Sequence, residues 1–152
     1  METLLLDRAP NGVVTLTLNR PEKKNAMNAA MFNELLAVLR EVGDSTSDRV
    51  LVITGAGDAF CSGADLGERG NDTRHPLLRL HWVADIALAL HRIPKPAIAK
   101  VNGIAAGAGM NLALACDLIV ASESARFSEI FARRGLTIDF GGSWLQIGRA
   151  HV

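Results

Sequence analysis

The sequence predicts an α/β fold in which short apolar strands alternate with amphipathic helices. Two stretches share the same order of strand, glycine-rich turn and helix start. One begins with the β-branched run Arg-Val-Leu-Val-Ile-Thr at residues 49–54, and the other with Ala-Ile-Ala-Lys-Val at residues 97–101. Repeated strand–turn–helix units favour a sheet layer covered by helices, built here as a spiral.

The composition is that of one soluble globular domain. The chain has 152 residues, of which 49% are apolar and 21% charged, and its formal net charge is zero. That length is sufficient for a real core. The balanced charge gives no indication of nucleic-acid or membrane binding, and no apolar run is long enough to span a bilayer. The lack of a signal-peptide pattern and two cysteines in apolar contexts, Cys61 and Cys116, favour free thiols and a cytoplasmic location.

The N-terminal third is predicted to form two strands and a helix. Residues 3–7 and 13–18 are the strands, and the second alternates apolar and polar side chains. Asn28 is expected to cap a helix over residues 29–42, which Gly43 ends. Apolar side chains recur along this helix at a spacing that predicts core packing and no chemistry: Phe32, Leu35, Leu36, Leu39 and Val42.

The alternation continues through the rest of the chain. Polar residues 68–74 predict a loop, and residues 77–91 a second amphipathic helix. Residues 118–121 are predicted to form a buried strand and residues 129–134 a short helical segment, after which Ser143 caps a last helix. The side chains of the second helix expected to face inward are Leu80, Val83, Ala84, Ala87 and Leu90.

Glycine-rich turns follow both strand runs and predict a site for developing negative charge. Residues 107–109, Gly-Ala-Gly, lead into a helix over residues 110–116, and Gly63-Ala64 occupies a similar place after the first strand. A helix start presents unpaired N–H groups, and two such turns can direct two of them at one oxygen, forming an oxyanion hole. The alternative is that the glycines at 107–109 only permit close packing of helix against strand.

Three motifs in order resemble the crotonase (enoyl-CoA hydratase/isomerase) superfamily. They lie at residues 19–28, 60–66 and 102–117, and the resemblance extends from residue 11 to about residue 145. It implies a β-β-α spiral core. In this chain the core lacks the C-terminal helical region with which members complete the pocket and form trimers, so the chain is expected to be an N-terminal fragment.

The chain is accordingly divided into two parts. Residues 1–146 are assigned to the truncated spiral core. The last six residues, 147–152, resemble the translation of a common sequencing-library adapter and are suspected to be a non-native tail. Sequencing the genomic locus tests that hypothesis.

The resemblance also implies a ligand and the residues that hold it. The substrate is an acyl-CoA thioester, coenzyme A is part of that substrate, and neither a separate cofactor nor a metal is expected. The full-length form is expected to be a homotrimer or hexamer. The catalytic positions are the backbone N–H groups of Ala64 and Ala108 together with Asp139. The implied substrate-binding positions are Lys24, Ala26, Ala64, Asp65, Leu66, Gly67, Ala108 and Asn111.

The two glutamates that a hydratase of this family uses are replaced at their matched positions. Asn111 stands at the first and Phe131 at the second, and neither side chain can exchange a proton. Asp139, in the run Gly-Leu-Thr-Ile-Asp-Phe-Gly-Gly, resembles the single base of the phenylacetate-pathway isomerases. The chain is therefore expected to isomerise an enoyl-CoA or ring-epoxide acyl-CoA through a thioester enolate.

Several alternatives remain open at this point. The protein could be an enoyl-CoA hydratase, or an acyl-CoA-binding fragment without turnover. Asp139 could be a loop residue that bonds its own backbone, with Glu129 as the base. Asp65 could be a helix N-cap, and the polar loop around Lys24 could be a solvated connection.

Overall fold

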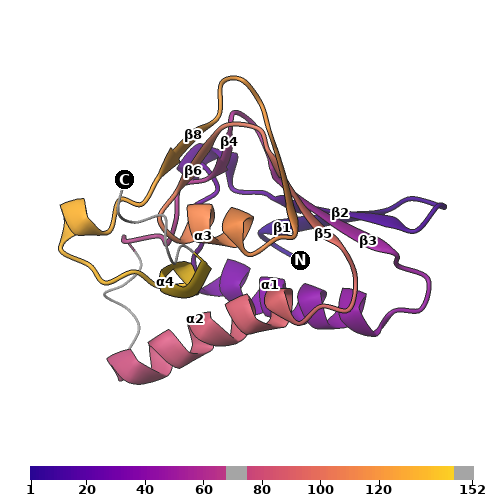
Figure 1. Ribbon diagram of the computed structural model, residues 1–152, viewed down its shortest axis with the longest axis horizontal. Coiled ribbons are helices and arrows are strands. Elements are labelled where there is room, and N and C mark those ends of the chain that lie inside the picture. The colour runs from indigo at the N-terminus through magenta and orange to yellow at the C-terminus, as the bar shows by residue number, and fades with distance from the viewer. Residues whose placement is uncertain (68–74, 146–152) are drawn as a thin grey trace.

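The computed structural model describes residues 1–67 and 75–145, and it arranges them as two sheets above a layer of helices (Figure 1). The small sheet lies at the top of that view, the large sheet extends to the right, and helices α1 (Ala29–Asp44) and α2 (Pro76–His91) lie below. The loop expected at residues 68–74 and the tail at residues 147–152 fall outside the described residues.

The large sheet has five strands in the order β1-β2-β3-β5-β7. β1 pairs antiparallel with β2, and the other neighbours are parallel. Each parallel connection contains a helix, as parallel pairing requires: α1 follows β2, α2 follows β3, and α3 (Ala108–Leu114) follows β5. The strands are β1 (Leu4–Arg8), β2 (Val13–Leu18), β3 (Val50–Gly55), β5 (Ala97–Val101) and β7 (Leu118–Ala121).

The small sheet shows that the fold is a repeated β-β-α unit. Its three parallel strands are β4 (Ala59–Cys61), β6 (Ile104–Ala106) and β8 (Arg126–Ser128). Each follows a strand of the large sheet after a short turn, so after the first unit, β1-β2-α1, each repeat contributes one strand to each sheet. The predicted spiral is confirmed. Sequence reasoning missed β4 and β6 because three-residue strands are too short to show a period of two.

Helix α1 begins as predicted but ends later. Asn28 caps it by accepting a hydrogen bond from the Met31 N–H, at 3.0 Å. Gly43 was expected to stop the helix and does not, since α1 continues to Asp44. The Lys95 ammonium donates hydrogen bonds to the carbonyls of Val42, Gly43 and Ser45 there. These bonds satisfy carbonyls that the helix end leaves without an internal partner, so no glycine stop is needed.

The expected inward face of α2 is partly wrong. Ala87 and Leu90 are buried, but Leu80 is 54% exposed and Ala84 is also exposed, and Ile86 takes a buried place instead. The helix is apolar around most of its circumference, so its sequence could not define one inward stripe.

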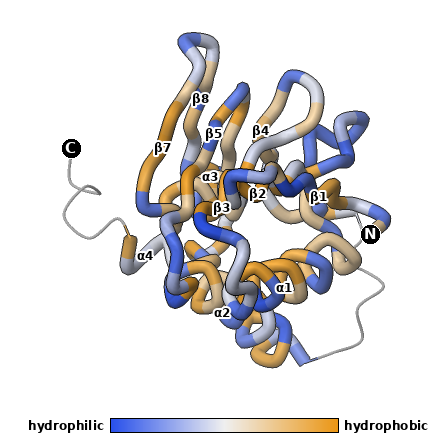
Figure 2. The backbone as a smooth tube through the Cα atoms, turned by 90° about the vertical axis from the view of Figure 1, so that its right-hand side faces the viewer, coloured by the Kyte–Doolittle hydropathy of each residue, from blue (hydrophilic) through white to orange (hydrophobic). Residues whose placement is uncertain are grey.

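Strand β7 and the elements after β8 also differ from expectation. β7 was expected to be buried, but all four of its residues are exposed. It forms an edge of the large sheet, and Figure 2 shows it as an apolar strand at the side of the molecule. The 129–134 segment contains the short 3₁₀ helix η3 (Ala132–Arg134), and Ser143 lies inside α4 (Gly142–Leu145) rather than capping it. Among the described residues, no helix is long and apolar enough to cross a membrane.

Candidate active site

The turn after β4 and the turn after β6 are packed directly against each other. A Cβ added at Gly63 would lie 2.9 Å from the Ala106 oxygen and 3.6 Å from the Ala108 nitrogen. A Cβ added at Gly109 would lie 2.3 Å from the Cys61 oxygen. Both positions therefore require glycine, and this close approach brings the backbones of Ala64 and Ala108 together.

The N–H groups of Ala64 and Ala108 take no part in the backbone hydrogen bonds that surround them. Met27 donates to the Gly63 oxygen at 2.8 Å and accepts from the Asp65 N–H at 2.9 Å, so the Ala64 N–H points away from Met27. Ala108 is the first residue of α3, so its N–H has no helical carbonyl four residues earlier to which it could donate. Within residues 1–67 and 75–145, neither N–H donates a hydrogen bond. Ala108 has no positive φ, so alanine is unstrained there.

Phe131 fills the space beside the second turn. The Gly107 N–H donates to the Ser128 oxygen at 2.9 Å, which joins this turn to the end of β8. A Cβ at Gly107 would meet the side chains of Ile130 and Phe131, each at 3.6 Å. Phe131 is 5% exposed. At this place next to Ala108 the chain therefore presents an aromatic ring and no carboxylate.

Asn111 fixes the Asp139 loop to the start of α3. It lies one helical turn after Ala108, is fully buried, and donates from Nδ2 to the Asp139 carbonyl at 3.0 Å. The same carbonyl accepts the Gly142 N–H, also at 3.0 Å. No donor among the described residues reaches the Asn111 Oδ1. The Asp139 backbone is thus held beside the turns that contain Ala64 and Ala108, which we call the alanine turns, although Asp139 is 31 residues from Ala108 in the chain.

Glu129 and Asp139 lie close enough for their charges to interact. Burial raises the pKa of Glu129 above its ordinary value, and the negative charge of Asp139 raises this pKa further. Oε2 of Glu129 and Oδ1 of Asp139 are both buried from solvent. Sequence reasoning named these two residues as rival bases, whereas in the structure the charge of one acts on the pKa of the other. No spacing in the sequence indicated that the loop after η3 returns to Asn111 of α3.

The residues expected to bind coenzyme A gather around Arg20, which sequence reasoning missed. Its guanidinium Nη1 lies 2.6 Å from the Ala26 oxygen and 3.0 Å from Asp65 Oδ2. Asp65 Oδ1 accepts the Gly67 N–H at 3.0 Å, so Asp65 closes a turn onto Gly67, and the residues that a helix capped by Asp65 would occupy next, 68–74, lie outside the described residues. The next described helix, α2, is capped by His75.

Lys24 and Leu66 border the same edge and point to solvent. Both are exposed, and the Lys24 ammonium lies 3.8 Å from the Asp58 carboxylate. Asn25 beside them is fully buried. It accepts from the Arg20 N–H at 2.9 Å and donates to the Ala59 oxygen at 2.8 Å, and these bonds hold the loop against β4.

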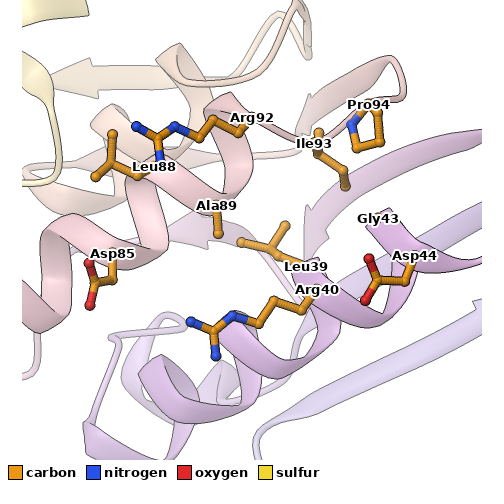
Figure 3. Close-up of a pocket in the computed structure, with 10 residues that line it drawn as sticks. All are labelled: Leu39, Arg40, Gly43, Asp44, Asp85, Leu88, Ala89, Arg92, Ile93 and Pro94. Carbon is orange, nitrogen blue, oxygen red and sulfur yellow. The ribbon is translucent and has the colours of Figure 1, made fainter.

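A separate pocket of about 370 Å³ lies between α1 and α2 (Figure 3). Arg40 of α1, Asp85 of α2 and Arg92 after α2 border it. None of the expected site residues lines this pocket, so it is distinct from the alanine turns. Among the described residues, no group of three or more His, Cys, Asp or Glu side chains could hold a metal ion.

Together, the repeated β-β-α units and the two backbone N–H groups at adjacent turns define a crotonase-type spiral protein. Residues 8–151 match the enoyl-CoA hydratase/isomerase family, and the chain belongs to this family. The family and fold predicted from the sequence are confirmed.

Three similar proteins illustrate the relationship. The chain is 41% identical over 150 residues to the 1,2-epoxyphenylacetyl-CoA isomerase of Escherichia coli, covering 95% of this chain and 57% of that protein. It is 44% identical over 146 residues to a "probable enoyl-CoA hydratase" of Rhodobacter capsulatus, covering 93% and 56%. The crystal structure of an enoyl-CoA hydratase of Mycobacterium smegmatis matches with a TM-score of 0.88 and 39% identity, covering 95% and 57%. The chain thus spans little more than half the length of these relatives.

Proposed function

We propose that the full-length protein isomerises an enoyl-CoA or ring-epoxide acyl-CoA through a thioester enolate. The observation that carries the proposal is the hydrogen bond from Asn111 to the Asp139 carbonyl, which fixes Asp139 beside the alanine turns. Phe131 is buried against the same turn and cannot exchange a proton. An isomerase needs one base that removes a proton and returns it elsewhere, and this arrangement of residues suits that need.

The reaction begins with proton transfer to Asp139. Its carboxylate takes a proton from an acidic carbon of the acyl chain, and the electron pair of the broken C–H bond moves toward the thioester oxygen. The N–H groups of Ala64 and Ala108 bind this oxygen as it becomes negative, which is worth about 2.7–4 kcal/mol for each donor. Asp139 then returns the proton to a different carbon and the carbonyl re-forms, so the product is an isomer of the substrate.

The coenzyme A portion is proposed to lie along the edge organised by Arg20. Asp65, Leu66 and Gly67 would follow the pantetheine arm after the Ala64 donor, with Lys24 and Ala26 near the adenine end. The ion pair from Arg20 to Asp65 supports this placement because it joins the two loops that would line the arm. We also propose that the full-length form is a cytoplasmic homotrimer or hexamer, which light scattering of the purified protein tests.

Hydration of an enoyl-CoA is the second candidate, because Glu129 adds a second carboxylate beside Asp139. Hydration requires one group to activate water and another to exchange the proton with carbon. The Rhodobacter capsulatus relative is described as a hydratase and the Escherichia coli relative as an isomerase, so both candidates have a similar protein in their favour.

The deciding experiment uses the complete reading frame at the genomic locus. The purified full-length protein is incubated with a 3-enoyl-CoA and, separately, with a 2-enoyl-CoA, and the products are separated from the substrate by chromatography before their masses are measured. Conversion without a change in mass, abolished in Asp139→Asn, supports isomerisation. Gain of one water would establish the hydratase instead. Binding of the CoA ester without turnover would leave an acyl-CoA-binding protein.

A further inference from the structure

The turn that begins at Asp139 has a backbone conformation that its sequence does not favour. The Gly142 N–H donates to the Asp139 carbonyl at 3.0 Å, which closes a four-residue turn. Both central residues have a positive φ, 51° at Phe140 and 76° at Gly141. Glycine, asparagine and aspartate dominate both places in such a turn. Gly141 meets this requirement, but phenylalanine at positive φ is strained, and the surrounding structure must offset that strain.

Burial of the Phe140 ring is the feature that offsets the strain. Phe140 is 2% exposed and belongs to the main hydrophobic core. None of residues 132–139 is buried, so Phe140 is the first buried side chain after Phe131. An aromatic ring contributes a large apolar area when it leaves water. The ring therefore anchors to the core a stretch of chain that has no other buried side chain, and it does so directly after Asp139.

Asn111 holds the same turn from the other side. Its Nδ2 donates to the Asp139 carbonyl at 3.0 Å. A Cβ added at Gly142 would lie 2.3 Å from this Nδ2, so the backbone of Gly142 packs directly on the Asn111 amide. The carbonyl of Asp139 is thus bound, and the side chain of the next residue is buried. These two fixed points define the orientation of the Asp139 backbone, from which its carboxylate extends.

On the basis of the proposed function, we propose that Phe140 is a positioning residue whose buried ring holds the strained turn and so directs the Asp139 carboxylate at the substrate carbon. Core packing alone does not require a positive φ, whereas strained backbone is concentrated at active sites. A base must lie within reach of the proton that it removes. Phe140 exchanges no proton itself, so its loss should slow proton transfer without weakening the binding of the CoA portion.

The first test examines the turn without any substrate. Amide hydrogen exchange of the full-length protein is measured for wild type, Phe140→Gly and the control Leu35→Ala, which shortens another fully buried side chain, in α1. Glycine adopts the positive φ without strain but lacks the ring. The Gly142 amide should exchange about tenfold faster or more in Phe140→Gly, through local opening, and at the wild-type rate in Leu35→Ala. Unchanged exchange in Phe140→Gly would overturn the proposal.

The second test separates kcat from KM in the full-length enzyme. A displaced base costs rate, so Phe140→Gly should lower kcat for isomerisation about tenfold to a hundredfold with KM little changed. Phe140→Leu restores an apolar anchor and should recover most of the loss. Leu35→Ala should lower the melting temperature through the cavity that it leaves, yet keep the wild-type kcat well below that temperature.

The third test changes the backbone of the turn and leaves the Phe140 ring in place. A Cβ added at Gly141 would meet nothing closer than the Ala87 Cβ at 3.8 Å, so Gly141→Ala disturbs φ without a clash. It should lower kcat as Phe140→Gly does, again with KM little changed. Gly141→Asn should keep more of the activity, because asparagine tolerates positive φ. A wild-type kcat in Gly141→Ala would show that the turn conformation does not direct Asp139.

Two further kinetic outcomes count against the inference. A wild-type kcat in Phe140→Gly shows that the ring is not needed to place the base. Equal losses of kcat in Phe140→Gly and Leu35→Ala show a general effect of a weakened core. If the wild-type protein catalyses no isomerisation at all, the proposed function fails, and the exchange rate of the Gly142 amide still decides whether Phe140 holds the turn, so the two failures are recognised separately.

Discussion

Arg20 and Asp65 form an ion pair in which Nη1 and Oδ2 lie 3.0 Å apart, and the side chains are only 13% and 15% exposed. The guanidinium also binds the Ala26 oxygen, so one cation joins the polar loop after β2 to the turn that follows β4. The Ala64 N–H belongs to that turn. The ion pair therefore helps to set the direction of a proposed oxyanion donor from a position 44 residues earlier in the chain.

Replacing Arg20 by Met should destabilise the protein markedly. Met keeps most of the apolar stem but leaves the Asp65 carboxylate largely buried without its cation, which typically costs about 3–5 kcal/mol. Chemical unfolding of the variant measures the loss. The matched control is Asp58→Asn, which breaks the exposed pair with Lys24 and should change the free energy of unfolding by less than about 1 kcal/mol. Equal effects of the two variants would show that the burial of the Arg20 pair is unimportant.

Removing the Lys95 ammonium should loosen the C-terminal end of α1. It binds three carbonyls there, and hydrogen bonds to a charged group contribute about 1.5–3 kcal/mol each without being additive. Lys95→Met should therefore lower the free energy of unfolding by about 2–3 kcal/mol. Amide hydrogen exchange should accelerate selectively at residues 42–45. Lys100→Met, at an exposed position of β5, is the control and should leave that exchange unchanged.

Two glycine-to-alanine changes should have opposite effects. At Gly109 the new methyl group would lie 2.3 Å from the Cys61 oxygen, so the two alanine turns must separate. Stability and catalysis by the full-length enzyme should both fall. At Gly43 the nearest atoms are 3.8 Å away and the residue is inside a helix, so Gly43→Ala should stabilise by about 0.5–1 kcal/mol. Thermal unfolding of both variants tests these two expectations. An unchanged melting temperature in Gly109→Ala would contradict the close packing of the turns.

The base is tested by hydrogen exchange at the substrate carbon. Asp139→Asn keeps the shape but removes the basic oxygen, so isomerisation and solvent deuterium incorporation should fall roughly a hundredfold or more. CoA-ester binding should change little, because Asp139 is proposed to face the acyl end. Glu123→Gln serves as the control. Exchange that survives in Asp139→Asn but disappears in Glu129→Gln would transfer the role of base to Glu129.

The two thiols should be inert at ordinary pH and should limit stability in alkali. Burial raises the pKa of Cys61 and of Cys116 from 9.0 to about 12, and both cysteines are free. The thiol form is therefore favoured in the folded state, and stability should be constant below pH 9 and decline as the pH rises from 9 toward 12. A thiol reagent should label the native protein slowly at pH 8 and the unfolded protein at once. Fast labelling of the native protein would show that the thiols are accessible.

The parts of this fold that the sequence predicted are those with a clear periodic pattern. The alternation in β2, the apolar stripe of α1 and its Asn28 cap each have a local cause, and each was found. The three-residue strands β4 and β6 have no local pattern, because their positions depend on pairing with each other and with β8. In α2 the apolar residues extend around the helix, so which of its side chains are buried depends on the elements packed against it and not on its own sequence.

The candidate site likewise contains residues that were recognisable from the sequence and residues that were not. Gly63, Ala64 and the 107–109 turn were recognisable because glycine is required where two backbones approach closely. The nearness of Glu129 to Asp139 was not recognisable, since it depends on Asn111 binding a carbonyl 28 residues away. Arg20 was missed because an arginine in a polar loop resembles a solvated one until its partner Asp65 is placed beside it.

The small parallel sheet has a consequence for how this protein can change over time. The two alanine N–H groups leave the ends of β4 and β6, and neighbouring strands lie about 4.8 Å apart, so main-chain pairing determines their separation. Because the donors are main-chain N–H groups, the side chains at 64 and 108 can be replaced by other small ones without removing a donor. The oxyanion site proposed above is made of main-chain groups, so one or two of the surrounding carboxylates can be replaced without rebuilding its donors.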